Sequence, residues 1–245
     1  MKNRLSGTFL SEIPFSNMPI ILKNIGFDFL IIDNEHGAFD YVDISKIIMI
    51  SKLVGIEVII RLADASRKDI LKFMDMGAQG LLLPMTNNQK DIMEVIRHAK
   101  YPPQGQRGIS TMRAHSMYNL IDINNYMKNA NQDTKIYAQI ETIDGLNNIH
   151  EILSVDGVDG FFLGPNDLSA EFNCLDNDNA NQILEAIDQL KIVSSNLNKT
   201  AGIITTNPNY LNRAKINQYQ MISVGSELSM LKKASKDIYN LIMEN

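Results

Sequence analysis

The stretch Phe27-Asp-Phe-Leu-Ile-Ile-Asp-Asn-Glu-His-Gly37 turns from apolar to polar at one point along the chain. Residues 27–32 are almost continuously apolar, which is the pattern of a short strand that is buried on both faces of a sheet. Residues 33–37 are polar and follow this strand directly. Because strands buried on both faces are typical of parallel sheets, the stretch favours an α/β protein with polar side chains at a strand end.

Seven other short apolar runs resemble residues 27–32, so the sequence predicts eight strands, of which 8–10 is the weakest. Amphipathic stretches between these runs predict helices. One of them, 66–76, has a Ser/Asp start and ends before Gly77, which is a good C-terminal cap. The other strands are expected at 8–10, 57–62, 80–84, 135–141, 160–164, 201–205 and 219–225, and the helices at 41–53, 66–76, 88–100, 142–153, 179–197 and 227–243.

The alternation of strands and helices predicts a parallel sheet, and eight strand–helix units in 245 residues are usual for a (β/α)8 (TIM) barrel. We therefore expect an α/β fold in which residues 1–245 form a single barrel domain. A doubly wound open sheet is the structural rival, but the chain lacks the Gly-x-Gly-x-x-Gly turn that such a fold normally shows. The long polar connections at 101–113 and 172–181 are expected to help build a site.

Composition excludes several classes of protein. The formal net charge of −5, the absence of Trp and the lack of a long Lys/Arg run argue against a nucleic-acid partner. Cys174 is the single cysteine, so no disulfide can form within the chain, which fits a reducing compartment. The polar N-terminus lacks the apolar core of a signal peptide, and no apolar run approaches the ~20 residues of a membrane span. We expect a cytoplasmic protein with no membrane partner.

Polar side chains stand directly after four of the predicted strands, and the carboxyl ends of the strands form the functional face of a barrel. Burying such groups is costly unless they find partners. Each has a structural alternative when taken alone: a loop histidine, an ion pair or a helix cap. Their convergence on one mouth favours a functional site. The residues are Asp33 and His36, Arg61, Gln139 and Glu141, and Asp167 within Gly164-Pro-Asn-Asp-Leu-Ser169.

A resemblance to a known family rests on five segments in a characteristic order. Their order and spacing are similar to those of the HpcH/HpaI family of class II pyruvate aldolases, from about residue 6 to residue 226. The segments are Ile32-Asp-Asn-Glu-His-Gly37, Asp75-Met-Gly-Ala-Gln79 with Leu83-Pro84, Tyr101-Pro-Pro-Gln-Gly-Gln-Arg-Gly108, Gln139-Ile-Glu141 and Gly164-Pro-Asn-Asp-Leu-Ser169.

The resemblance implies a metal site and a pyruvate site. Glu141 and Asp167 would be the two protein ligands of a divalent cation, with water completing its shell. An all-oxygen site suits Mg²⁺ or Mn²⁺, with Co²⁺ as a further option. Pyruvate would chelate the cation through its carboxylate and keto oxygens. Gln139, Gly164 and the backbone of Asn166 would help to hold it.

The resemblance also implies the groups that move protons and stabilise charge. His36 would be the acid/base group, and Arg61 would stabilise negative charge on the enolate or alkoxide oxygen. Asp75 matches a position at which the family brings an Asp to this histidine from a neighbouring subunit, and Asp33 is a further possible partner for His36. The implied assembly is a homo-oligomer, a trimer or a hexamer, with the C-terminal helix from Glu227 as a packing element.

The function implied is the reversible cleavage of a 4-hydroxy-2-oxo acid into pyruvate and an aldehyde through a metal-stabilised enolate. A Schiff-base mechanism is less favoured, because Lys135 opens its strand rather than ending it. Alternatives are a related lyase, such as an oxaloacetate decarboxylase or a CoA-ester lyase, and a non-catalytic ligand-binding barrel. Residues 108–114, including Arg113, and residues 172–181 are expected to set the choice of aldehyde.

Overall fold

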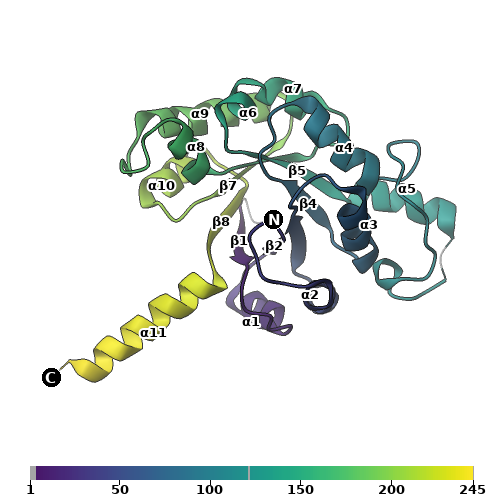
Figure 1. Ribbon diagram of the computed structural model, residues 1–245, viewed down its shortest axis with the longest axis horizontal. Helices are drawn as coiled ribbons and strands as arrows, with labels where there is room; N and C mark the ends of the chain where they lie inside the picture. The colour runs from purple at the N-terminus through teal and green to yellow at the C-terminus, as the bar shows by residue number, and fades with distance from the viewer. Residues whose placement is uncertain (1–3, 121, 245) are drawn as a thin grey trace.

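The computed structural model describes residues 4–120 and 122–244. Eight parallel strands follow one another around a closed barrel, and β8 pairs with β1 to close it (Figure 1). This arrangement confirms the predicted (β/α)8 barrel. The strands are β1 (Leu5–Leu10), β2 (Phe29–Asp33), β3 (Glu57–Arg61), β4 (Gly80–Leu83), β5 (Lys135–Ile140), β6 (Gly160–Leu163), β7 (Thr200–Ile204) and β8 (Met221–Ser226).

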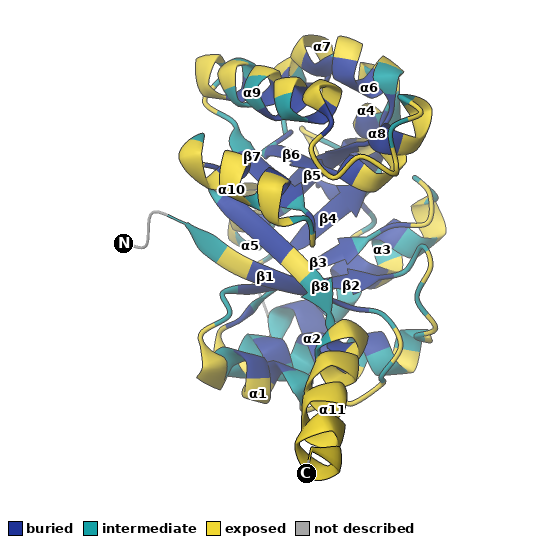
Figure 2. Ribbon diagram, turned by 90° about the vertical axis from the view of Figure 1, so that its left-hand side faces the viewer, coloured by how far each residue is buried: buried dark blue, intermediate teal, exposed yellow. Residues whose placement is uncertain are grey.

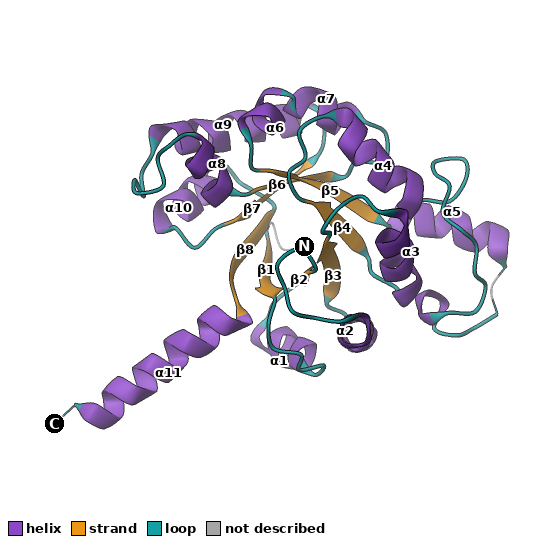
Figure 3. Cartoon of the chain, viewed as in Figure 1, coloured by secondary structure: helices purple, strands orange, loops and turns teal. Residues whose placement is uncertain are grey.

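Helices surround the barrel, whereas the last one extends away from it (Figure 3). Among the described residues, no helix is both long and apolar enough to cross a membrane. The helices are α1 (Met18–Ile25), α2 (Tyr41–Val54), α3 (Arg67–Met76), α4 (Gln89–Ala99), α5 (Ile123–Asp133), α6 (Ile143–Asn147), α7 (Ile149–Ser154), α8 (Pro165–Glu171), α9 (Asn181–Asn196), α10 (Pro208–Ile216) and α11 (Glu227–Met243), with a 3₁₀ turn, η1 (Ala114–Ser116).

Local signals explain where the helices begin and end. The Ser66 side chain accepts the backbone N–H of Asp69 at the start of α3, and Gly77 ends α3 in the left-handed conformation, with φ of 97°. Both signals were predicted from the sequence. At the start of α4, the side chain of Asn88 and the side chain of Asp91 form a reciprocal capping box, which satisfies backbone donors that would otherwise lack partners.

The sequence pattern missed four helices and merged two others. α1 and α8 have 8 and 7 residues, too few for a clear helical period. α8 and α10 each have Pro near the first position, a placement that a helix tolerates. α5 has the polar sequence Ile-Asn-Asn-Tyr-Met-Lys-Asn-Ala-Asn-Gln-Asp, for which the sequence pattern predicts no element. The predicted helix 142–153 is two helices, because Asn148 ends α6 and its side-chain amide donates to the carbonyl of Asn87 at 2.9 Å.

The barrel interior is filled by side chains, so the site is at the mouth. Phe162 packs between Phe29 and Tyr137, with ring centroids 6.0 and 5.4 Å away. Gly7 and Gly202 make room for these rings, since a Cβ would come 2.2 Å from the Phe29 ring and 2.6 Å from the Phe162 ring. The larger core cluster joins buried residues of the strands with buried residues of the surrounding helices, and most of the strand ribbon is coloured as buried in Figure 2.

α11 differs from the other helices in its exposure (Figure 2). Glu227, at its first position, is its only buried residue among those described. Large apolar side chains farther along it are exposed, including Leu231 at 53%, Ile238 at 59% and Leu241 at 74%. Apolar side chains in such number on one helix leave an apolar surface exposed.

Candidate active site

The ends of β2 and β3 present a tightly bonded ion pair at the mouth. Asp33 and Arg61 stand opposite each other in the strand register. Arg61 Nε donates to Asp33 Oδ1 at 3.0 Å, and Arg61 Nη2 donates to Oδ2 at 2.6 Å. The guanidinium also lies 5.0 Å above the ring of Phe9 from β1. The two hydrogen bonds to Asp33 and the contact with the Phe9 ring restrict the Arg61 side chain, so its positive charge is held in one position.

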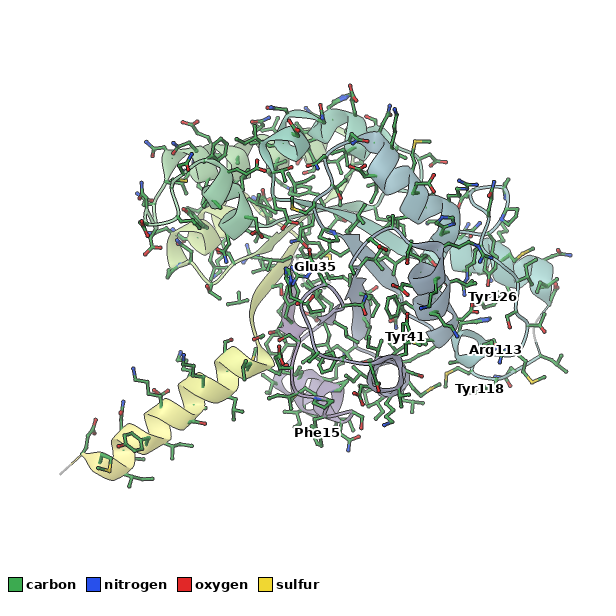
Figure 4. All side chains as sticks on the ribbon, in the orientation of Figure 1. Phe15, Glu35, Tyr41, Arg113, Tyr118 and Tyr126 are labelled. Carbon is green, nitrogen blue, oxygen red and sulfur yellow. The ribbon has the colours of Figure 1, made fainter. Side chains whose placement is uncertain are left out.

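Glu35 is a member of this cluster that the sequence reasoning did not assign. Its Oε2 lies 3.0 Å from Nη1 of Arg61, and it lies close to the barrel mouth in Figure 4. Burial raises the pKa of the Glu35 carboxyl, an effect that Arg61 and His36 oppose and that Asp33 and Asp167 reinforce. The available signal was its place in the polar run after β2, but residue type alone does not separate it from its neighbours.

His36 lies on the loop after β2, and its side chain is 74% exposed. Its Nε2 atom is 3.7 Å from Glu35 Oε2. Asp33, named from the sequence as a possible partner of His36, contacts the backbone of this loop instead. Asp33 Oδ1 accepts the backbone N–H of Glu35 at 3.1 Å and that of His36 at 3.2 Å. Asp33 therefore orients the loop and Arg61, and Glu35 is the carboxylate nearest the ring.

Glu141 follows β5 and is 2% exposed. Its Oε1 accepts the backbone N–H of Met85 at 2.7 Å, and its Oε2 accepts a hydrogen bond from the amide of Gln139. Burial raises the pKa of the Glu141 carboxyl to about 7, although these two hydrogen bonds act to lower it. Gln139 Oε1 is buried and has no hydrogen-bonding partner in the described part of the chain. A buried carboxyl beside a free amide oxygen is an arrangement that a cation would stabilise.

Asp167 and Gly164 belong to the turn from β6 into α8. Asp167 is exposed and lies in the first turn of α8, which follows the carboxyl end of β6 at the mouth. Its charge raises the pKa of both Glu141 and Glu35. Gly164 is required by packing, since a Cβ there would lie 2.7 Å from Glu141 Oε2. Asn166 is exposed beside Asp167. The structure therefore brings together the predicted residues of β5 and β6 with those of β2 and β3.

The residues fit a divalent cation held by two carboxylates. Within residues 4–120 and 122–244, no group of three or more His, Cys, Asp or Glu side chains is placed to hold a metal ion. Glu141 and Asp167 offer two carboxylates from neighbouring strand ends, and Mg²⁺ is commonly held by one or two carboxylates together with water and substrate oxygens. Because burial disfavours the ionised form of Glu141, a cation beside it would offset that cost.

Asp75 and Arg113 lie elsewhere. Asp75 is near the C-terminal end of α3, which runs back from the mouth toward the opposite end of the barrel, and its Oδ1 accepts from Arg107 Nη2 at 2.9 Å. The chain therefore does not bring Asp75 to its own His36. Arg113 donates to Ser110 Oγ at 3.1 Å and lies well away from Glu35 in Figure 4.

Comparison with known proteins gives the relatives of this chain. The sequence model of the family described as HpcH/HpaI aldolase/citrate lyase matches residues 15–234. A hydroxypyruvate/pyruvate aldolase of Roseobacter denitrificans is 34% identical over 89% of this chain and 85% of its own length. A 4-hydroxy-2-oxo-heptane-1,7-dioate aldolase of Escherichia coli is 30% identical over 88% of this chain and 82% of its own length.

A solved structure supports the fold. The HpcH/HpaI aldolase from Desulfitobacterium hafniense superposes with a TM-score of 0.94, covering 99% of this chain and 94% of that one, at 24% identity. The family match spans most of the chain, and the carboxylates, arginine and histidine stand at the mouth of the barrel that this architecture uses for catalysis. This chain belongs to the HpcH/HpaI aldolase/citrate lyase family and is an enzyme of the aldolase type.

Proposed function

We propose that the protein is a class II aldolase that reversibly cleaves a 4-hydroxy-2-oxo acid into pyruvate and an aldehyde. The observation that carries the proposal is the meeting, at one mouth, of the carboxylates Glu141 and Asp167 with the bonded group of Arg61, Asp33 and Glu35. The names of the two relatives above, both aldolases, support this reaction class.

Glu141 and Asp167 would hold the divalent cation, Mg²⁺ or Mn²⁺, with Co²⁺ as a further option, because both ligands are oxygens. When bound, the cation supplies Lewis-acid stabilisation of the oxygen on which negative charge develops. Gln139 presents a buried amide oxygen and an amide N–H that orients Glu141. Together with Gly164 and the backbone of Asn166, Gln139 would orient the carboxylate end of pyruvate.

His36 would move the protons. In cleavage, its ring takes the proton of the 4-hydroxyl group, the C3–C4 bond breaks, and the aldehyde leaves with the electrons of the bond remaining on pyruvate as its enolate. A proton then returns to C3 and completes pyruvate. A histidine exchanges protons readily near neutral pH, and the Glu35 carboxylate lies 3.7 Å from the ring of His36. Arg61 fixes a positive charge near the oxygen that becomes negative.

The active enzyme would be a homo-oligomer, either a trimer or a hexamer. Asp75 is remote from the mouth of its own chain, so its expected contact with His36 needs a neighbouring subunit. Exposed apolar side chains of α11, such as Leu231, Ile238 and Leu241, provide a surface for packing between subunits. A single cysteine fits the reducing cytoplasm as the location.

The test is pyruvate release from a panel of 4-hydroxy-2-oxo acids, followed by a coupled lactate dehydrogenase assay, with Mg²⁺ or Mn²⁺ present. Glu141→Gln removes the charge of one ligand and should abolish release. Glu94→Gln changes an exposed carboxylate on α4 and serves as the matched control. Release of pyruvate from oxaloacetate but from none of the 4-hydroxy acids would contradict the proposal and indicate a decarboxylase.

A further inference from the structure

A buried carboxylate stands where β8 passes into α11. Glu227 is 4% exposed, and its Oε1 accepts three consecutive backbone N–H groups, from Ser11 at 2.9 Å, Glu12 at 2.6 Å and Ile13 at 3.0 Å. These residues form the loop that follows β1. Its Oε2 is buried and has no hydrogen-bonding partner among the residues described. Hydrogen bonds to a charged acceptor are roughly twice as strong as neutral ones, so Glu227 fixes this loop firmly.

The β1 loop in turn contacts the loop that carries His36. The carbonyl of Ser11 accepts the backbone N–H of Ala38 at 2.8 Å. Gly37 permits this approach, because a Cβ at that position would lie 2.9 Å from the Ser11 carbonyl oxygen and 2.1 Å from that of Asp33. The backbone of the His36 loop is thus bonded to Asp33 on one side and to Ser11 on the other.

The same end of β1 supports a second group of the mouth. Phe9, two residues before Ser11, lies under the guanidinium of Arg61, 5.0 Å from its carbon. A shift of the β1 end would therefore act on both His36 and Arg61. Glu141 follows β5 and Asp167 lies in α8, which follows β6; β5 and β6 are on the other side of the barrel from β1, and the two carboxylates share none of these contacts.

We propose that Glu227 is a positioning residue for the proton-transfer group. Its carboxylate fixes the backbone of residues 11–13, and through the Ser11 carbonyl it sets where His36 stands over the mouth. This inference rests on the proposed function, in which His36 moves the proton. The inference predicts that a change at Glu227 alters the rate of proton transfer. Binding of the cation and of pyruvate should be unaffected, because it depends on residues that follow β5 and β6.

The primary variant is Glu227→Gln, which keeps the size of the side chain and removes its charge. Glu227→Asp keeps the charge on a shorter side chain and should lie between Glu227→Gln and the wild type. Asp159→Asn is the matched control. The Asp159 carboxylate also accepts a backbone N–H, from Ile136 at 2.9 Å, but at the opposite end of the barrel.

The first readout needs no activity. The chain has four histidines, so ring signals can be resolved by NMR in the metal-free protein and His36 assigned with His36→Gln. In Glu227→Gln the signals of His36 should shift, and in Asp159→Asn they should not. Rings that should stay unchanged in every variant are those of His98, His115 and His150. Unchanged His36 signals in Glu227→Gln would overturn the proposal.

The second readout separates rate from binding. In Glu227→Gln, kcat for exchange of the pyruvate methyl protons should fall by about 10-fold to 100-fold, because small misplacements of a catalytic group cost that much. KM for pyruvate and the calorimetric affinity for Mn²⁺ should stay within about 2-fold. A parallel loss of kcat and Mn²⁺ affinity would mean general disturbance and would overturn the proposal. Absence of exchange in the wild type would instead count against the proposed function, and the NMR readout would still test the positioning.

Discussion

Substitution of Glu141 by Gln should stabilise the metal-free protein at alkaline pH. Burial raises the pKa of this carboxyl from 4.5 to about 7. Between these values the folded chain binds a proton that the unfolded chain has released, so this group's contribution to stability falls as pH rises through the window. Above pH 7 the full pKa shift applies, and the buried, ionised Glu141 lowers the free energy of unfolding of the wild type by about 3 kcal/mol.

The net effect is smaller, because the amide introduced by Glu141→Gln could present an N–H₂ group where Glu141 Oε2 now accepts from Gln139. Losing that hydrogen bond costs about 1 kcal/mol, which leaves a net gain of about 2 kcal/mol at pH 8. For a chain of this size that gain raises Tm by about 4–8 °C. At pH 5 the carboxyl is already protonated, so only the cost of the lost bond remains.

Thermal unfolding in EDTA at pH 5 and pH 8 measures the difference in stability between Glu141→Gln and the wild type at each pH. Glu94→Gln, on the exposed face of α4, is the control. Mn²⁺ should reverse the order at pH 8, because only the wild type binds the ion and is stabilised by it. The reasoning would be refuted by a variant that is destabilised equally at both pH values, since Glu141 would then be ionised at no cost in the folded protein.

Three further outcomes follow from the geometry of the mouth. Mn²⁺ affinity should tighten by about 10-fold from pH 6 to pH 8 as Glu141 ionises, and calorimetry showing no pH dependence would contradict its raised pKa. Gly164→Ala should lose Mn²⁺ affinity and retain its circular dichroism spectrum, because the new Cβ would lie 2.7 Å from Glu141 Oε2. Unchanged affinity would show that the Glu141 side chain can move to accommodate the methyl group. Arg61→Lys should lower kcat by about 10²-fold and leave Mn²⁺ affinity unchanged, because Lys keeps the charge but cannot form the two paired hydrogen bonds to Asp33. Activity equal to that of the wild type would show that Arg61 has no part in the mechanism.

Much of the fold could be predicted because strands buried on both faces have an apolar pattern that is independent of tertiary detail. The short run 8–10 proved to be part of β1 (Leu5–Leu10), which is longer because Leu5 and Ser6 pair with β8. Helices that begin at a proline or span two turns carry too little periodicity, and α8 and α10 were missed for that reason.

The candidate site also contains both residues that the sequence could select and residues that it could not. Asp33, Arg61, Glu141 and Asp167 could be selected because each lies at the end of a strand or shortly after it, and the ends of parallel strands meet at one mouth. Glu35 could not be selected, because its contact with Arg61 depends on the conformation of the loop after β2.

Glu227 also could not be selected from the sequence, because its contacts depend on residues far away in the chain. Its three backbone partners are more than 200 positions away in the chain, and only closure of the barrel by β8 and β1 brings them together. The proposed role of Asp75 would depend on a neighbouring subunit, which no pattern within one chain can place.

Exchange of the pyruvate methyl protons in heavy water, followed by NMR, tests the central claim most directly, because it needs no knowledge of the aldehyde. The account predicts exchange that requires Mg²⁺ or Mn²⁺, stops on addition of EDTA, disappears in Glu141→Gln and is weakened in His36→Gln. Exchange that persists in EDTA, or a folded oligomer that shows none with any divalent cation, would contradict it.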